Sequence, residues 1–78
     1  MIESIGVIGG GAWGTALALT ASRAGRGTLL WARDPITVAE INSRHENPRH
    51  MPGVPLGGAL KATGSLAEAA RADAIILA

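Results

Sequence analysis

The sequence contains no cysteine among its 78 residues, which excludes disulfide bridges and cysteine-ligated zinc. This absence is typical of proteins from a reducing compartment. The formal net charge is only +1 and the arginines are scattered, so no basic patch indicates a nucleic-acid partner. No apolar run reaches the roughly 18 residues of a membrane span, and residues 1–4 have no basic region of a secretory signal. We therefore expect a cytoplasmic protein with no nucleic-acid partner and no membrane span.

Patterns of catalytic and metal-binding residues are also missing from the sequence. It has no Ser-His-Asp or Cys-His arrangement and no close pair of carboxylates. His45 and His50 are five residues apart rather than four, and Pro48 breaks any helix that could present both rings on one face. We therefore predict no metal site and assign no catalytic residue. In this segment we expect a polar loop in which Glu46 or Asn47 bonds to the backbone; a role in lining a pocket is the less favoured interpretation.

The most informative feature that is present is a glycine-rich turn within residues 5–14, which read IGVIGGGAWG. Gly9, Gly11 and Gly14 have the G-x-G-x-x-G spacing. They follow a short apolar run, and a helix-forming segment comes directly after them. Gly9 allows a sharp turn, Gly11 lets phosphate oxygens approach main-chain N–H groups, and Gly14 lets the helix lie close to the strand. The positive end of that helix then faces the anion. A plain tight turn is the alternative, but the context favours a site for a dinucleotide pyrophosphate.

The rest of the chain alternates between apolar runs and helical patterns. We predict strands over residues 3–8, 27–32, 60–63 and 74–78, helices over 12–24, 35–44 and 65–72, and a polar loop over 45–58. Helix ends are indicated by Gly25 after the first helix, Asp34 and Pro35 before the second, and a Ser65–Glu68 capping box before the third.

This order of elements predicts an α/β fold. Alternation of strands and helices gives a parallel sheet with helices on both faces, and right-handed crossovers give a Rossmann-type strand order of 3-2-1-4. The cofactor crevice is expected at the carboxyl ends of the first and fourth strands. The sequence stops within the apolar run 74–78. We therefore expect an incomplete sheet, with residues 1–78 forming the N-terminal part of an NAD(P)-binding domain and the C-terminal substrate domain lying outside this chain.

The end of the second predicted strand bears on the choice of cofactor. Asp34 lies about 20 residues beyond the glycines, where an acid that binds the ribose is expected, but it is also the predicted N-cap before Pro35. Arg33 can bind a 2′-phosphate or stack on the adenine, or remain a solvated side chain. An arginine beside an acid that is committed to capping favours NADP over NAD, and both cofactors remain candidates.

The two tryptophans have different predicted roles. Trp13 occupies a variable position of the glycine motif at the first turn of the helix, where it either flanks the pyrophosphate or packs against the sheet edge. Trp31 lies within the second strand and is expected in the core.

Three blocks of the sequence resemble the bacterial NAD(P)-dependent glycerol-3-phosphate dehydrogenases: IGGGAWGTALA at residues 8–18, LWARDP at 30–35 and HENPR at 45–49. The similarity continues through residues 51–54, 60–63 and 72–78. The glycine motif is shared by many dehydrogenases, whereas the second and third blocks are more specific. Gly10 stands where alanine is usual in the family, and residues 64–65 replace a more usual acidic helix start.

The resemblance implies reversible reduction of dihydroxyacetone phosphate to sn-glycerol 3-phosphate, which feeds glycerophospholipid synthesis in the cytoplasm. It implies contacts of the nicotinamide cofactor with Ala12, Trp13 and Arg33, a catalytic lysine beyond residue 78, and a small phosphorylated substrate. A homodimer of the full-length form is compatible with it. Two alternatives are a dehydrogenase of the 6-phosphogluconate or 3-hydroxyacyl-CoA type and a non-catalytic NAD(P)-binding module.

Overall fold

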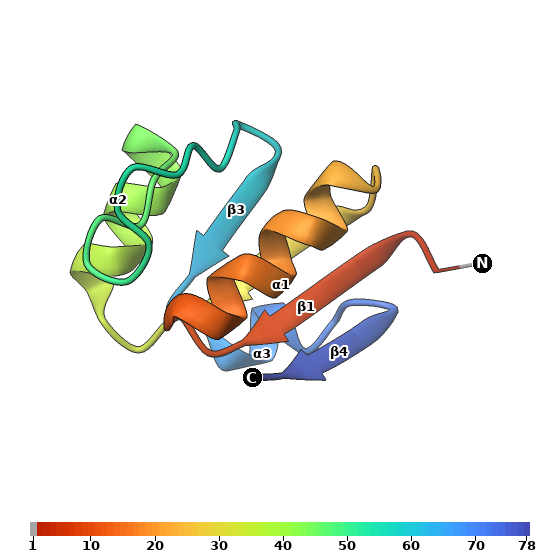
Figure 1. The fold of residues 1–78 in the computed structure, drawn as a ribbon. Helices are drawn as coiled ribbons and strands as arrows, with labels where there is room; N and C mark the ends of the chain where they lie inside the picture. The colour runs from red at the N-terminus through yellow and green to blue at the C-terminus, as the bar shows by residue number, and fades with distance from the viewer. Residues whose placement is uncertain (1) are drawn as a thin grey trace.

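Short apolar runs and helical segments alternate along the whole chain, and the computed structural model, which describes residues 2–78, follows this order. The strands are β1 (Ser4–Ile8), β2 (Gly27–Trp31), β3 (Leu60–Thr63) and β4 (Ala74–Leu77), and the helices are α1 (Ala12–Arg23), α2 (Pro35–Arg44) and α3 (Leu66–Ala69). The strand pairs of the sheet are parallel, in the order β3-β2-β1-β4; in Figure 1 the arrows of β3, β1 and β4 point the same way. The predicted α/β fold with strand order 3-2-1-4 is confirmed.

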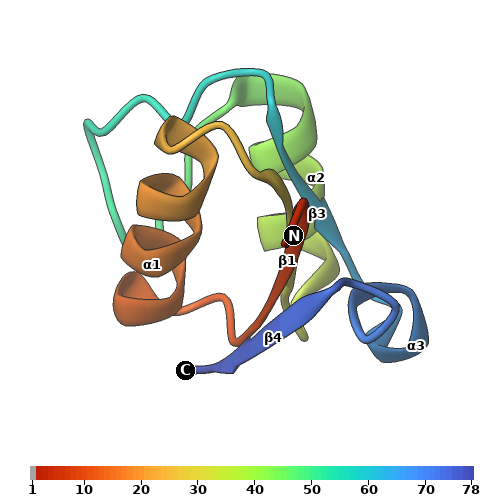
Figure 2. The same cartoon turned by 90° about the vertical axis from the view of Figure 1, so that its right-hand side faces the viewer.

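The sheet has a packed face and a more open face. Side chains of β1, β2 and β3 meet those of α1 and α2 in one apolar cluster, which consists of Val7, Ala18, Leu19, Leu30, Ile41, Leu56, Leu60 and Ala62. α3 lies on the opposite side of the strands from α1 (Figure 2). A Cβ at Gly6 would lie 2.2 Å from the Ala69 carbonyl oxygen, so the missing side chain lets α3 touch the sheet directly. On this open face Ile75 and Leu77 are exposed.

The helix ends follow the predicted signals with one exception. The Asp34 carboxylate accepts from the Ile36 N–H at 2.9 Å, with Pro35 next to it, and Gly25 follows the first helix with a φ of +83°. The Ser65 hydroxyl caps the Glu68 N–H.

The third helix is shorter than predicted. It spans Leu66–Ala69 rather than residues 65–72, and only turns follow it. The capping box is half formed, because the Glu68 carboxylate accepts from the Thr63 hydroxyl rather than from the Ser65 N–H, which donates to the Thr63 hydroxyl oxygen.

A polar contact joins the beginnings of β1 and β4. The Asp73 carboxylate accepts from the N–H groups of Glu3 and Ser4 at 3.0 and 3.2 Å, and the Ser4 hydroxyl accepts from the Asp73 N–H at 3.0 Å. The backbone N–H of Glu3, followed by that of Ser4, holds the pKa of Asp73 below its usual value.

Among the helices of residues 2–78, none has the length and apolar character needed to cross a membrane.

Candidate functional site

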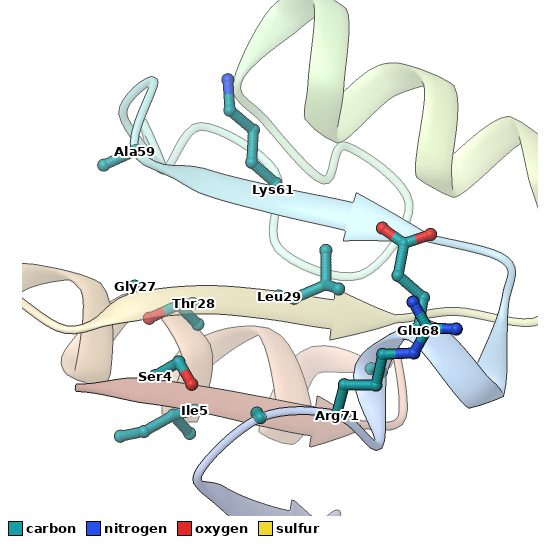
Figure 3. A pocket seen from close by; sticks show the side chains of 11 residues that line it. Ser4, Ile5, Gly27, Thr28, Leu29, Ala59, Lys61, Glu68 and Arg71 are labelled. Atoms are coloured by element: carbon teal, nitrogen blue, oxygen red, sulfur yellow. The ribbon is translucent and has the colours of Figure 1, made fainter. Parts of the chain in front are cut away.

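Two cavities are candidates for a ligand site. The larger, about 380 Å³, lies on the open face of the sheet, where it is lined by the amino ends of β1 and β2 and by residues of β3 and the α3 region (Figure 3). The smaller, about 210 Å³, lies beyond the carboxyl ends of β1 and β2. Open parallel sheets bind ligands outside the carboxyl ends of their strands. We therefore take the smaller cavity, with the glycine turn beside it, as the candidate functional site.

The glycine turn has the geometry that its sequence requires. Gly9 has a φ of +131°, a conformation that other residues rarely adopt, and its N–H donates to the Trp31 carbonyl at 3.0 Å. A Cβ at Gly14 would lie 1.8 Å from the Gly9 carbonyl oxygen. The first turn of α1 therefore packs directly on the turn that leaves β1, and this contact is available only to glycine.

Gly11 differs from these two glycines because its surroundings are open. It is the N-cap of α1, with a φ of −74° and a ψ of −173° that any residue can adopt, and a Cβ there would meet nothing within 4 Å. The first N–H groups of α1 have no acceptor within the helix, and the first turn carries no acidic residue. The positive end of α1 is thus free to bind an anion at this position.

The smaller cavity brings together residues from three parts of the chain. Gly11, Arg33 and Asp34, all predicted site residues, line it together, while Gly9, Ala12, Trp13 and Gly14 belong to the adjoining turn without lining it. Three lining residues were not predicted, Gly10, Ala32 and Thr37, and the seventh, His50, belongs to the loop for which pocket lining was the less favoured interpretation. The cavity lies at the carboxyl ends of β1 and β2, and the cofactor crevice expected at the ends of β1 and β4 stays a prediction.

The two tryptophans differ in their exposure to solvent. Trp13 is 71% exposed, so the alternative in which it packs against the sheet edge is wrong, while its contact with a dinucleotide stays a prediction. Trp31 is half-buried and lies outside the core cluster, so its expected place in the core is wrong; its indole N–H donates to the Gly64 carbonyl at 3.1 Å. This bond ties the end of β2 to the segment that follows β3.

Both oxygens of the Asp34 carboxylate already have partners. Oδ1 accepts from the Ile36 N–H as the helix cap, and Oδ2 forms an ion pair with Arg49. The capping role predicted for Asp34 is confirmed, and it competes with the ribose-binding role, which stays a prediction. Arg33 is exposed beside it.

The loop after α2 reaches the glycine turn. Asn47 is fully buried, and its amide donates to the Gly10 carbonyl at 3.0 Å. The Glu46 carboxylate accepts from the Gly53 N–H at 3.2 Å. The prediction that Glu46 or Asn47 bonds to the backbone is confirmed for both. The less favoured interpretation also applies, since His50 of the same loop lines the cavity. Within residues 2–78 no three acidic or histidine side chains gather as a metal site would need.

The comparisons with known proteins agree on one family. The family model for the NAD-dependent glycerol-3-phosphate dehydrogenase N-terminus matches residues 4–78. The chain is 60% identical over 76 residues to a glycerol-3-phosphate dehydrogenase (NAD(P)+) of Paramagnetospirillum magneticum, covering 97% of this chain and 28% of that protein. It is 56% identical over 78 residues to the protein of that name from Rhodospirillum rubrum, covering 99% and 22%.

Solved structures give the same result. The glycerol-3-phosphate dehydrogenase of Coxiella burnetii is similar with a TM-score of 0.87 and 32% identity, over 97% of this chain and 24% of that one. That of Plasmodium falciparum is similar with a TM-score of 0.79 and 30% identity, over 99% and 24%. The chain spans about a quarter of the length of these relatives.

Proposed function

The chain belongs to the NAD-dependent glycerol-3-phosphate dehydrogenase family, and on that basis we propose that it binds NAD or NADP for an oxidoreductase that interconverts sn-glycerol 3-phosphate and dihydroxyacetone phosphate. In this proposal residues 1–78 are the N-terminal part of the NAD(P)-binding domain, and the substrate domain lies in the part of the relatives that the chain does not span. The enzyme serves glycerophospholipid synthesis in the cytoplasm and works as a homodimer.

The observation that carries the proposal is the glycine turn between β1 and α1. A pyrophosphate needs main-chain N–H groups that no side chain covers, and the open position of Gly11 supplies them. The turn also ends at a helix without acidic residues in its first turn. The residues present therefore fit a dinucleotide. The residues proposed to hold it are Gly9, Gly11, Ala12, Trp13 and Gly14 at the pyrophosphate and Arg33 and Asp34 at the ribose.

The part of these residues in the reaction is binding and orientation. The chemistry supplied by a bound nicotinamide is transfer of a hydride to or from C2 of the substrate. The N-terminal end of α1 stabilises the negative charge of the pyrophosphate and so fixes where the rest of the cofactor lies. We propose that the group that takes or gives the hydroxyl proton lies outside residues 1–78, as the family resemblance implies.

We further propose that NADP is preferred over NAD, although both bind. An acid that selects NAD must offer free oxygens to the ribose hydroxyls, and both oxygens of Asp34 are engaged. Arg33 lines the cavity, and Arg49 lies against Asp34 and offsets its charge. The excess of positive charge at this end of the cavity favours the 2′-phosphate that only NADP carries.

The experiment that tests the proposed function is turnover by the full polypeptide. With dihydroxyacetone phosphate and NADPH we expect loss of NADPH absorbance and formation of glycerol 3-phosphate. No turnover with this substrate overturns the assignment. Activity with 6-phosphogluconate or a 3-hydroxyacyl-CoA instead supports the other type of dehydrogenase, and tight NADPH binding without any turnover supports a non-catalytic module.

A further inference from the structure

Asn47 is a buried polar side chain whose bonds go to the glycine turn. Its residue is 0% exposed, and burial of an amide is costly unless it forms hydrogen bonds. The amide nitrogen donates to the Gly10 carbonyl at 3.0 Å and to the Thr15 hydroxyl at 2.8 Å. Asn47 and Gly10 are 37 positions apart in the sequence, so this contact joins the loop after α2 to the turn after β1.

Thr15 extends this contact to the next peptide. Its hydroxyl hydrogen is donated to the Gly11 carbonyl at 2.7 Å, while its oxygen accepts from Asn47. The Gly11 carbonyl also accepts from the Thr15 N–H at 3.0 Å. Two successive carbonyls of the turn, those of Gly10 and Gly11, are therefore held on the inner side by one connected set of hydrogen bonds.

Holding these carbonyls inward determines where the N–H groups point. In a planar trans peptide the N–H is directed opposite to the C=O, and the described peptide bonds include no cis form. The Gly10 carbonyl shares its peptide with the Gly11 N–H, and the Gly11 carbonyl shares its peptide with the Ala12 N–H. With both carbonyls directed at Asn47 and Thr15, the two N–H groups face the opposite, outer side of the turn.

The same loop reaches the other end of the cavity. His50 lines the cavity beside Arg33, and Arg49 is paired with Asp34. The loop thus contacts the glycine turn through Asn47 and the end of β2 through Arg49 and His50. Asn47 therefore lies at the position proposed for the pyrophosphate, and the other two residues lie at the position proposed for the ribose.

We propose that Asn47 is a positioning residue for the pyrophosphate of the cofactor: by holding the Gly10 carbonyl, directly and with Thr15, it aims the N–H groups of Gly11 and Ala12 at the phosphates. This role rests on the proposed function, because it requires that a dinucleotide binds at the turn. It predicts that Asn47 affects NADPH and NADH equally, since both carry the pyrophosphate, and does not affect a ligand that lacks it.

The test measures ligand affinity of the full polypeptide carrying Asn47→Leu, which keeps the number and branching of the side-chain heavy atoms but donates no hydrogen bond. We expect binding of NADPH and of NADH to weaken by about tenfold each, because the Asn47 amide loses its hydrogen bonds to the Gly10 carbonyl and to the Thr15 hydroxyl and no longer orients the turn. Adenosine 2′-phosphate, which has the ribose end but no pyrophosphate, keeps its affinity. A purely structural role would weaken all three ligands together, so the difference between them is the decisive readout.

Asn42→Leu is the matched control. The Asn42 amide also bonds to backbone, donating to the Ala62 carbonyl at 2.9 Å and accepting from the Ala62 N–H at 2.8 Å, but these bonds join α2 to β3 and do not involve the glycine turn. We expect this variant to lose thermal stability without any preferential loss of the dinucleotides. Circular dichroism verifies that both variants are folded.

Three results would overturn the proposed role of Asn47. The first is a folded Asn47→Leu chain with unchanged affinity for NADPH and NADH, and the second is equal weakening of adenosine 2′-phosphate. If Asn47→Leu does not fold, Thr15→Val decides, because it removes the hydroxyl that donates to Gly11 and accepts from Asn47, while the bond from Asn47 to the Gly10 carbonyl can remain. Selective loss of dinucleotide affinity supports the role, and unchanged affinity is the third contrary result. A wild-type polypeptide that binds no dinucleotide instead overturns the proposed function itself, and is recognised before any variant is made.

Discussion

A methyl group added at Gly11 should weaken cofactor binding with little effect on stability, whereas one added at Gly14 should destabilise the fold itself. The two glycines belong to the same motif, three residues apart, but their surroundings differ. At Gly11 an added Cβ meets nothing within 4 Å, whereas at Gly14 it would lie 1.8 Å from the Gly9 carbonyl oxygen. Alanine at Gly11 therefore tests the effect on cofactor affinity of a side chain at the phosphate position, and alanine at Gly14 tests the effect of a steric clash on the stability of the fold.

The expected change in stability of Gly11→Ala is small because two terms oppose each other. Replacing glycine by alanine at an allowed φ restricts the unfolded chain and stabilises by about 0.4–1 kcal/mol. Alanine is a poorer N-cap than glycine by about 0.5 kcal/mol, and Gly11 is the N-cap of α1. The free energy of unfolding should therefore stay within about 0.5 kcal/mol of the wild type.

Gly14→Ala should instead destabilise strongly. The atom that its methyl group would meet is a main-chain carbonyl oxygen, which cannot rotate away as a flexible side chain could. The first turn of α1 must then move off β1, and overpacking of this kind costs about 3 kcal/mol or more. Natural proteins have only about 5–15 kcal/mol of stability to lose, so a substantial part of the Gly14→Ala protein should be unfolded.

Urea unfolding followed by circular dichroism measures both stabilities, and fluorescence titration measures NADPH and NADH affinity. For Gly11→Ala we expect near wild-type stability and at least tenfold weaker binding of both cofactors (roughly 1.4 kcal/mol). Gly11→Val should abolish binding, because its branched side chain fills the space of the pyrophosphate. Retained affinity in a folded Gly11 variant would show that the turn is only structural, and a large loss of stability at Gly11 would refute the steric distinction.

Three further predictions concern other parts of the molecule. Arg33→Glu should weaken NADPH by at least about tenfold more than NADH, since it opposes the 2′-phosphate, while Arg26→Glu at an exposed turn should not; equal losses at Arg33 would contradict the proposed role. The hydrogen bonds that lower the pKa of Asp73 stabilise the fold at pH values above 3.8, the usual pKa of the carboxyl group. This stabilisation is lost as the pH falls through the lower pKa of the folded state. The difference in melting temperature between wild type and Asp73→Asn should therefore be largest near neutral pH and close in acid, and a gap that does not vary with pH would refute this. Leu30→Ala should lower the free energy of unfolding by about 2–5 kcal/mol, because Leu30 is fully buried, whereas Leu66→Ala at a half-exposed position should cost under about 1 kcal/mol in the same urea titration.

Much of the fold could be predicted because its signals are local. The apolar runs, the Asp34–Pro35 cap and Gly25 each act over a few residues, and together they placed the strands and the first two helices within about a residue of their observed bounds. The third helix was predicted too long, since no local signal ends it before residue 72. Its last residue, Ala69, lies against Gly6 of β1, a contact between residues far apart in the sequence that local signals do not report.

The candidate site was predictable only where its residues act locally. The glycine motif fixes the turn by itself, so the sequence indicates Gly9 and Gly14 directly. Asn47 and His50 reach the site from a loop whose path depends on contacts with the turn and with β2, and no spacing rule reports such contacts. The one usable signal was an asparagine among polar residues next to Pro48, which favoured bonding to backbone without identifying Gly10 as the partner. The exposure of Trp13 likewise depends on how α1 sits on the sheet.

The central position of β1 has a consequence for the route by which the chain folds. β1 pairs with β2, where Ser4 is opposite Gly27, and with β4, where Ile5 is opposite Ala74. Closing the longer loop costs about 1 kcal/mol more entropy than closing the shorter one. During synthesis the edge of β1 that will bind β4 is therefore exposed until residues 74–77 emerge, and an unpaired apolar edge can pair with other chains. Aggregation of nascent chains, rather than instability of the finished sheet, is the hazard that this topology creates.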